Sequence, residues 1–377
     1  MEPDLNATSQ LLNTFYPLVA VIGVGYVGAH LVNIFSPFVD VIGYDISSTR
    51  IRKLSSENSG ANRMRFSTDS ENLEGALHFL IAVSTNSRLD GIGSIVVIES
   101  TVAIGTTRRL LEPLAISRGI LPACLQSRTS PPVCSISKIV SGLDNVVPGS
   151  LHAITELYEL AFDTIITVSS PEVAEMMKMY ENCQRTMAIA YANEMADACA
   201  RFGIDPFKVA ETAATKPFRY LPIFSSHGIG GYCISANPIY FMSTCTLPLL
   251  QYAHEKMSVR PSRIGSKLLT TLLDDNSRIH GPNHEPRLLI VGLGFKAGQS
   301  DLAHSPGIQL LNYMRLSTQV DLIFCDPLVE QATIPEVSKL SESHWTPEIL
   351  ETFNAIVVVT KQPGLDYSIW RGYKVSE

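Results

Sequence analysis

LVAVIGVGYVG, residues 18–28, is the stretch that decides how the N-terminal part of the chain folds. Its first five residues, Leu18–Ile22, are all apolar, as in a buried parallel strand. Glycines follow at positions 23, 25 and 28, in the pattern Gly-x-Gly-x-x-Gly. The first glycine permits a tight turn, the second lets a pyrophosphate approach the backbone, and the third lets a helix pack on the strand. The stretch therefore predicts a strand, a turn and a helix that bind a dinucleotide.

A carboxylate follows the next apolar segment, Val41–Tyr44. Asp45 lies 22 residues after Gly23, at the place where an acidic side chain can bind both ribose hydroxyls and repel a 2′-phosphate. This placement favours NAD over NADP as the cofactor. The alternative interpretation is a glycine-rich turn that binds no nucleotide.

Short apolar segments continue to alternate with longer segments along the chain. Strands are predicted at Phe79–Val83 and Ile95–Glu99 in the first half, and at Arg287–Val291, Leu322–Cys325 and Asn354–Thr360 in the second. Strands that alternate with helices form doubly wound parallel sheets. The sequence therefore predicts an α/β protein with two Rossmann-like domains.

A helical segment separates the two predicted sheets. Pro171–Arg201 is helical in pattern, as one long helix or as two in line, and Ser258 to about Asp274 predicts a second long helix. Asn276–Glu285 is mainly polar and predicts a surface loop. The expected domains are an N-terminal NAD-binding domain (1–167), a central helical domain with a long helix (168–274) and a C-terminal Rossmann-like domain (275–377).

Two features depart from a regular doubly wound pattern. Ser84–Ser94, between two predicted strands, is mostly polar or glycine, whereas a parallel crossover normally contains a helix. Either this crossover is reduced to a loop, or the two strands are not neighbours. The second Gly-x-Gly, at Gly292 and Gly294, lacks the third glycine and predicts a different ligand or a structural turn.

The composition excludes several classes of protein. The chain has 377 residues, 45% of them hydrophobic, and a formal net charge of −7 without a basic stripe, which argues against a nucleic-acid partner. The seven cysteines are odd in number and form no CxxC pair, so neither a disulfide framework nor a metal site is predicted. No cationic apolar leader and no span-length apolar run is present, so a cytoplasmic protein without membrane attachment is expected.

Several further motifs occur in a fixed order along the chain. They are Glu99-Ser100-Thr101-Val102 with Gly105-Thr106-Thr107, Glu175–Asn182 followed by Asn193-Glu194, Gly230-Gly231-Tyr232-Cys233, Gly292–Lys296 with Asp301 and Ser305-Pro306, and Cys325-Asp326-Pro327. In their order and rough spacing, from about Leu18 to about Leu365, these motifs resemble those of the UDP-glucose/GDP-mannose dehydrogenase family.

The resemblance implies a reaction in which NAD twice oxidises the C6 alcohol of a UDP-linked sugar. In such a reaction a thiolate at Cys233 attacks the intermediate aldehyde, and a thioester forms that water cleaves. Lys178 and Asn182 lie four residues apart on one helical face and can stabilise an oxyanion. An inert cysteine in a glycine loop and a lysine that only snorkels from an apolar helix are the competing interpretations. The implied catalytic residues are Cys233, Lys178, Asn182, Asn237 and Thr101.

The resemblance also implies two binding sites and an assembly. Cofactor contacts are expected at Gly23, Gly25, Tyr26, Val27, Gly28, Asp45, Arg50, Thr85 and Thr101. Substrate contacts are expected at Arg128, Lys178, Asn182, Arg219, Gly230 and Lys296, with the UDP group bound by the C-terminal domain. In the family the helical segment builds a dimer interface, so at least a homodimer is expected.

The chain departs from the family pattern at positions that handle water and substrate. Ser127 and Asn237 stand where the family has acidic residues, and amide and hydroxyl groups are poor acceptors of a proton from water. The family's arginine before Ser305-Pro306 is replaced by Ala303 or His304. Three hypotheses follow: a UDP-sugar 6-dehydrogenase, a divergent NAD-dependent enzyme with altered or redox-neutral chemistry on another substrate, and a silent binding protein.

Overall fold

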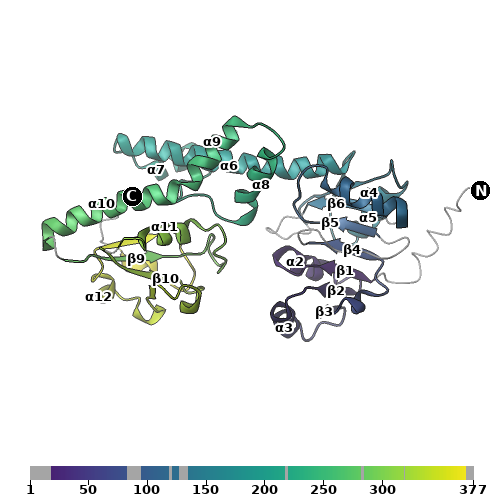
Figure 1. Cartoon of the computed structure of the whole chain (residues 1–377), viewed down its shortest axis with the longest axis horizontal. Coiled ribbons are helices and arrows are strands. Elements are labelled where there is room, and N and C mark those ends of the chain that lie inside the picture. Colours follow the sequence, from purple (N-terminus) through teal and green to yellow (C-terminus); the bar gives the residue numbers. More distant parts are fainter. Residues whose placement is uncertain are drawn as a thin grey trace, which may run out of the picture. The chain divides into compact units, whose positions relative to one another are not determined.

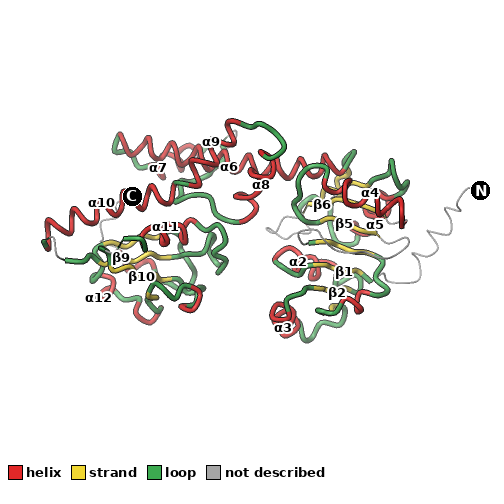
Figure 2. The backbone as a smooth tube through the Cα atoms, viewed as in Figure 1, coloured by secondary structure: helices red, strands yellow, loops and turns green. Residues whose placement is uncertain are grey.

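The computed structural model describes residues 18–82, 95–118, 121–126, 135–216, 220–281, 284–317 and 319–370. The chain divides into two compact units, Met1–Tyr180 and Glu181–Glu377. Each unit is built on its own sheet, and both sheets are visible as yellow strands in Figure 2.

The first unit contains an eight-stranded sheet in the order β3-β2-β1-β4-β5-β6-β7-β8. All neighbouring strands are parallel except β6 and β7. The strand order reverses between β1 and β4, and a ligand in such sheets binds at this switch point. The strands are β1 (Val19–Ile22), β2 (Val41–Tyr44), β3 (Met64–Ser67), β4 (His78–Ile81), β5 (Ile95–Ile98), β6 (Leu121–Gln126), β7 (Lys138–Gly142) and β8 (Ile165–Thr167).

Helices cover both faces of this sheet, so its central strands are buried along their whole length. One buried cluster joins the sheet to α2, α3 and α5, through residues such as Phe35 and Tyr158, and a second joins it to α4 through Leu111. All four residues of β1, of β4 and of β5 are buried. The helices are α2 (Tyr26–Phe35), α3 (Ser48–Glu57), α4 (Thr106–Arg118) and α5 (Ser150–Glu159), labelled in Figure 1.

The strands predicted in this unit are confirmed, with small shifts at their ends. β4 and β5 are hydrogen-bonded neighbours, with His78 opposite Ile95, so the alternative that these two strands are apart is wrong. The residues of the crossover itself, Ser84–Ser94, lie outside the described part of the chain. The sequence pattern predicted no strand at the positions of β3, β6, β7 or β8.

A single helix of 31 residues, α6 (Pro171–Arg201), follows the first sheet, so the alternative of two helices in line is wrong. The second unit continues with α7 (Pro206–Ala214), α8 (Tyr232–Met242), α9 (Pro248–Ser258) and α10 (Arg260–His280). The predicted loop at Asn276–Glu285 is therefore partly wrong, because α10 extends to His280. Buried Leu272 and Asn276 hold the last turns of α10 in place, and Gly281, with a φ of 87°, ends the helix.

The second sheet is parallel and has the order β11-β10-β9-β12. A buried cluster packs α10 and α11 (Pro306–Met314) on the sheet, and another, around Trp345, includes α12 (Pro347–Leu350). The predicted strands of this half are confirmed as β9 (Arg287–Val291), β10 (Asp321–Cys325) and β12 (Ala355–Val358), with β11 (Ser338–Lys339) as an addition. Two Rossmann-like sheets with helices between them in the chain are thus confirmed.

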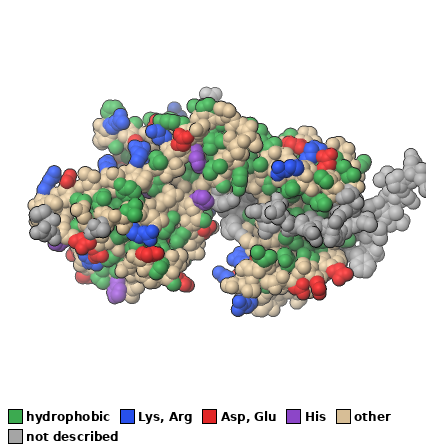
Figure 3. Space-filling view, viewed as in Figure 1, with side chains coloured by type: hydrophobic (Ala, Val, Ile, Leu, Met, Phe, Trp, Pro, Cys, Tyr) green, Lys and Arg blue, Asp and Glu red, His purple; other side chains and the backbone are tan. Residues whose placement is uncertain are grey.

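In the described part of the chain, no helix is both long enough and apolar enough to span a membrane. On the face drawn in Figure 3, Lys and Arg side chains are interspersed with Asp and Glu within each unit.

A charged cluster lies buried at the carboxyl end of β5. Lys138 Nζ donates to both carboxylate oxygens of Glu99, at 3.2 and 3.0 Å, and the Tyr158 hydroxyl donates to the same carboxylate. The Lys138 and Glu99 side chains are only 2% and 0% exposed. Burial, followed by the Glu99 charge, raises the pKa of Tyr158 well above its usual value, so its hydroxyl stays protonated as a donor.

We predict that Lys138→Met lowers the free energy of unfolding by about 3 kcal/mol, because it leaves the Glu99 carboxylate buried without its cation. Adding Glu99→Gln to this variant should restore part of the loss, because the remaining group is neutral. Urea unfolding measures both effects. The matched control is Lys53→Met in the exposed Lys53–Glu57 pair, which should change stability little; a similar loss in both lysine variants would contradict the prediction.

Candidate functional site

In the glycine-rich turn after β1, the backbone makes two close contacts, one at Gly23 and one at Gly28. Gly23 has a φ of 87°, which favours glycine, and its N–H donates to the Tyr44 carbonyl at 2.7 Å. A Cβ on Gly28 would lie 1.8 Å from the Gly23 carbonyl oxygen, so helix α2 can pack against the strand only with glycine at this position. These two glycines therefore have the structural roles that the sequence predicted for them.

The middle glycine differs, because a Cβ on Gly25 would meet no atom within 4 Å. Gly25 is also the N-cap of α2, and no side chain caps this helix. The first backbone N–H groups of a helix attract anions, so this open end of α2 suits a phosphate group. Here the open space and the uncapped helix coincide at the residue that the sequence assigned to pyrophosphate approach.

Asp45 and Arg50 fix the turn from the neighbouring strand and helix. Asp45 Oδ2 accepts a hydrogen bond from the Val24 N–H at 3.1 Å, while Oδ1 accepts from Ser47 N–H at 2.9 Å. Arg50 Nε donates to the Val24 carbonyl at 2.9 Å, and Nη2 to that of Gly25 at 3.4 Å. The structure thus brings the predicted cofactor residues from both sides of the turn together. The Asp45 carboxylate lies where an acidic side chain would bind the ribose in a dinucleotide site.

The second Gly-x-Gly turn is occupied by a side chain of the protein itself. Asp326, fully buried, accepts hydrogen bonds from the N–H groups of Leu293 and Gly294, at 2.7 and 3.2 Å. A Cβ on Gly292 would lie 1.8 Å from the Thr360 carbonyl oxygen. Because the N–H groups that would face a phosphate already bind Asp326, the geometry favours the structural turn among the two interpretations.

Cys233 lies in the first turn of α8, after the N-cap Gly231, and its side chain is exposed. The N-terminus of a helix favours a negative charge, so a thiolate formed here would face the positive end of α8. The five cysteines whose side chains the structure describes are all free: Cys183, Cys199, Cys233, Cys245 and Cys325. Burial raises the pKa of Cys183 to about 11 and that of Cys325 to about 12, which keeps both as inert thiols.

The start of α8 is tied to α6 through a carbonyl that the helix leaves unpaired. Pro238 lies inside α8 and has no N–H, so it cannot donate to the carbonyl of Ile234 four residues earlier. The hydroxyl of Thr186, on α6, lies 3.2 Å from this carbonyl and 3.2 Å from that of Asn182. This contact places the residue after Cys233 beside the turn of α6 that carries Asn182.

Two asparagines near this contact have buried amide groups without a partner. Asn182 is 2% exposed and Asn237 1% exposed, and neither Nδ2 atom forms a hydrogen bond in the described structure. A buried unpaired donor costs about 1–3 kcal/mol, so such groups call for an explanation. Asn237 follows Cys233 by four residues on α8, on the same face of the helix.

The glycine loop before Cys233 packs against two residues that follow β9, Phe295 and Pro306. A Cβ on Gly230 would lie 2.9 Å from Phe295 Cβ and 3.0 Å from Pro306 Cδ, and one on Gly231 would meet the Phe295 ring at 3.0 Å. Gly231 also has a φ of 87°. Glycine is therefore required because Phe295 and Pro306 lie against the loop. The sequence motifs around Gly230 and Phe295 thus form one packed feature.

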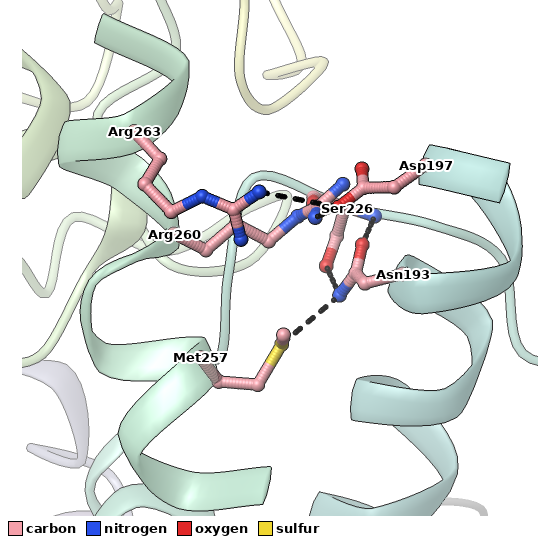
Figure 4. A network of polar contacts seen from close by, with 6 residues as sticks. All are labelled: Asn193, Asp197, Ser226, Met257, Arg260 and Arg263. Carbon is pink, nitrogen blue, oxygen red and sulfur yellow. Dashed lines mark hydrogen bonds and ion pairs between the residues drawn. The ribbon is translucent and has the colours of Figure 1, made fainter. Parts of the chain in front are cut away.

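A polar network holds the beginning of the same loop (Figure 4). Asn193 Oδ1, on α6, accepts from the Ser226 N–H at 2.7 Å, and Arg260 Nε donates to the Ser226 carbonyl at 2.9 Å. Arg260 Nη1 in turn binds Asp197 Oδ2 at 2.8 Å. Burial and the nearby Arg260 charge lower the pKa of His227, so its imidazole is neutral near pH 7. The network joins α6, α10 and the loop around one serine.

The first part of α6 is bound to the loop that follows β5. Glu175, fully buried, accepts hydrogen bonds from the N–H groups of Gly105 and Thr107 at 2.5 and 2.8 Å, at the start of α4. Glu172 pairs with Arg108 at 2.6 Å, and this guanidinium lowers the pKa of Glu172 to about 2. Lys178 lies one turn after Ala174 and is 8% exposed. Glu175 thus caps a helix, a role that its place in the motif did not reveal.

The remaining predicted residues fall into two groups. Thr101 is half-buried after β5 and Lys296 is exposed. Thr85, Arg128, Arg219 and also Ser127 lie outside the described residues, as does the side chain of Tyr26. Two residues that shape this site, Thr186 and Phe295, were not predicted as part of it from the sequence. Pro238 was the available signal, because a proline inside α8 leaves one carbonyl of the helix in need of a donor from elsewhere. In the described residues no group of three or more His, Cys, Asp or Glu side chains could hold a metal ion.

Comparison with known proteins shows that the chain is similar to dehydrogenases of nucleotide sugars. Residues 172–254 match the model of the central domain of the UDP-glucose/GDP-mannose dehydrogenase family. A UDP-N-acetyl-D-mannosamine dehydrogenase of Pyrococcus horikoshii is 26% identical and aligns with 93% of this chain and 91% of its own length. A UDP-N-acetyl-D-glucosamine 6-dehydrogenase of Pseudomonas aeruginosa is 28% identical, with 82% and 83% covered.

Solved structures agree at the level of the fold. A structure of the Pyrococcus horikoshii UDP-D-ManNAc dehydrogenase superposes with a TM-score of 0.77 at 26% identity, covering 92% of this chain and 90% of that one. A UDP-glucose dehydrogenase of Pyrobaculum islandicum shares the fold, with a TM-score of 0.75 at 18% identity and coverage of 97% and 94%. Residues 172–254 thus match the central domain of the UDP-glucose/GDP-mannose dehydrogenase family, and over most of its length the chain is similar to dehydrogenase enzymes that act on UDP-sugars.

Proposed function

We propose that this chain is an NAD-dependent dehydrogenase that oxidises the sugar of a UDP-sugar at a primary alcohol, through an adduct on Cys233. The observation that carries the proposal is the placing of Cys233: an exposed thiol in the first turn of α8, beside the α6 turn of Asn182. The named relatives act on UDP-N-acetyl-D-mannosamine and UDP-N-acetyl-D-glucosamine, which makes these two sugars the first substrates to test.

The turn after β1 fits NAD by the features of its own residues. The open space at Gly25 and the uncapped start of α2 suit a pyrophosphate, and Asp45 suits a ribose that carries no 2′-phosphate. When bound there, NAD supplies the hydride acceptor. The chain's own part is to hold the cofactor through Gly23, Gly25, Tyr26, Val27, Gly28, Asp45, Arg50, Thr85 and Thr101.

We predict that Gly25→Ala keeps the fold, because its Cβ meets open space, but weakens NAD binding at least about tenfold by blocking the pyrophosphate. Gly28→Ala is the contrasting variant: its Cβ meets the Gly23 carbonyl at 1.8 Å, so it should lower the unfolding temperature. Calorimetric titration with NAD and thermal unfolding separate the two effects. Unchanged NAD affinity in folded Gly25→Ala would refute the cofactor site.

The chemistry of the proposal assigns a role to each group around the thiol. Cys233 forms a bond to the aldehyde carbon of the partly oxidised sugar, and the carbonyl oxygen becomes an oxyanion. Lys178 and Asn182, one turn apart on α6, offer an ammonium group and an amide N–H to this charge. Thr101 and Asn237 can hold water by hydrogen bonds. Arg128, Arg219, Gly230 and Lys296 are the proposed substrate contacts, with the UDP group on the domain of the second sheet.

A second candidate function is a divergent enzyme of the same family with retained NAD and altered or redox-neutral chemistry on another substrate. The observation that favours it is Asn237, an amide close to Cys233 on a helix, α8, that contains no acidic residue. The yield of NADH separates the two functions. The UDP-sugar dehydrogenase should form two NADH per UDP-sugar, whereas the redox-neutral enzyme should bind NAD without net formation of NADH.

We predict that Cys233→Ala lowers NADH formation from UDP-N-acetyl-D-mannosamine or UDP-N-acetyl-D-glucosamine by about 10³-fold or more, because the covalent step is lost. The matched control is Cys245→Ala, which changes another exposed cysteine just after α8 and should keep the wild-type rate. Absorbance of NADH reports the rate. Equal rates in wild type and Cys233→Ala would remove the thiol from the mechanism.

We further propose that the chain forms a homodimer through α6. Five large apolar side chains are exposed along this helix at intervals of three, four, eleven and four residues, which places them on one side: Val173, Met176, Tyr180, Tyr191 and Met195. Tyr180 is 69% exposed and Tyr191 63% exposed. A long apolar stripe on a single helix suits the same stripe on a second copy, related by a twofold axis.

Light scattering after size exclusion should give a mass of about twice 41.2 kDa at micromolar concentration. Tyr191→Asp combined with Met195→Asp should shift this to the monomer, because two carboxylates would be buried without partners at the interface. Ile279→Asp, at a 73% exposed apolar residue of α10, serves as control and should leave the dimer intact. A wild-type monomer would overturn the proposal.

A further inference from the structure

Two amide donors, on α6 and α8, have no hydrogen-bond partner in the described structure. Asn182 Nδ2 and Asn237 Nδ2 are both buried, and neither donates a hydrogen bond to any described residue. Structural asparagines elsewhere are paired, as in Asn193, which binds Ser226 on both sides of its amide. Donors that a fold leaves unpaired at a reactive thiol indicate an acceptor that arrives with the substrate.

Both donors lie within one helical turn of the contact that joins α6 to α8. Thr186 lies 3.2 Å from the carbonyl oxygens of Asn182 and Ile234, so its hydroxyl marks where the two helices approach. Asn182 lies one turn before Thr186 on α6. Asn237 lies three residues after Ile234 and four after Cys233 on α8. The thiol and the two amides therefore belong to one small region of the second unit.

Among the described residues, α8 offers no carboxylate, and two carboxylates of α6 are already engaged. α8 contains no Asp or Glu in its sequence from Tyr232 to Met242. On α6, Glu181 pairs with Arg185, and Glu175 binds the start of α4. An amide donates hydrogen bonds but does not take up a proton from water, so Asn237 stabilises an anion without activating a nucleophile.

We propose that Asn237 is a catalytic residue that, together with Asn182, binds the oxyanion of the Cys233 adduct, so that this protein forms its thioester faster than it hydrolyses it. The inference rests on the proposed function. The Cys233 sulfur attacks as a thiolate, and the sulfur–carbon bond forms as the carbonyl electron pair moves to oxygen, where the amides bind the resulting negative charge. The pair then returns as that carbon gives up a hydride to bound NAD, which leaves a thioester on Cys233. Hydrolysis needs a water molecule whose proton must pass to a base, and Asn237 offers none.

The test follows the pre-steady-state and steady-state formation of NADH by wild type, Asn237→Asp and Asn237→Ala, with NAD and either UDP-N-acetyl-D-mannosamine or UDP-N-acetyl-D-glucosamine in excess over the enzyme. Wild type should release about two NADH per Cys233 in a rapid phase, followed by a steady rate at least about tenfold slower. Mass spectrometry of the quenched protein should find the acyl group on Cys233. This second readout is independent of the rate.

The two variants should act on opposite steps. Asn237→Asp, nearly equal in shape, should raise the steady rate about tenfold or more and remove the adduct, because a carboxylate can accept the proton. Asn237→Ala should slow adduct formation about 10²-fold, the typical effect of losing one oxyanion donor. Circular dichroism and NAD titration check that each variant is folded.

Two results would overturn the inference while leaving the proposed function intact: linear NADH formation without an adduct in wild type, or an Asn237→Ala variant that acylates Cys233 at the wild-type rate. Absence of NADH with either sugar in wild type would instead overturn the proposed substrate class, and the inference with it.

Discussion

One hydrogen bond between helices fixes the start of α8, where Cys233 lies. Pro238 removes the N–H that would have paired the Ile234 carbonyl, and the Thr186 hydroxyl takes its place at 3.2 Å. Because Ile234 follows Cys233 directly, this bond fixes the start of α8 against α6. The glycine loop can then pack on Phe295 and Pro306, which leave no room for any side chain at Gly230. The second unit thus holds its thiol from three directions, through α6, the loop and the second sheet.

The two Gly-x-Gly turns show how one local pattern serves two purposes. After β1, Asp45 accepts from one N–H group of the glycine turn, that of Val24, and leaves Gly25 and the start of α2 open. After β9, Asp326 takes the N–H groups of both Leu293 and Gly294, so the turn is closed by the protein itself. The two turns therefore differ in how many of their backbone donors the following carboxylate occupies.

Much of the fold could be predicted because most of its predicted strands are short, mainly apolar segments, several of them followed by glycine or an acidic residue. β2 and β9 begin and end at the predicted residues, and α6 does so over its 31 residues. β7 and β8 are less regular in pattern, with Lys138 buried in β7 and two exposed residues in β8. Their place in the sheet is therefore visible only from their hydrogen bonds to neighbouring strands. The loop predicted after Asn276 failed at its start because burial of Asn276 overrode its polarity.

The sequence by itself determined the glycine-rich turn after the first strand and the class of enzyme, and it predicted Cys233, Lys178 and Asn182 as site residues, because these depend on residue type and on spacing within one helix or turn. Only the tertiary structure decided that Glu175 is a helix cap, that Glu99 pairs with Lys138 and accepts from Tyr158, and that the amides of Asn182 and Asn237 are buried without partners. The physical reason is that hydrogen-bond partners far apart in the chain are chosen by packing. A pattern of residue types records which groups are available, whereas burial decides which of them are satisfied and which remain for a ligand.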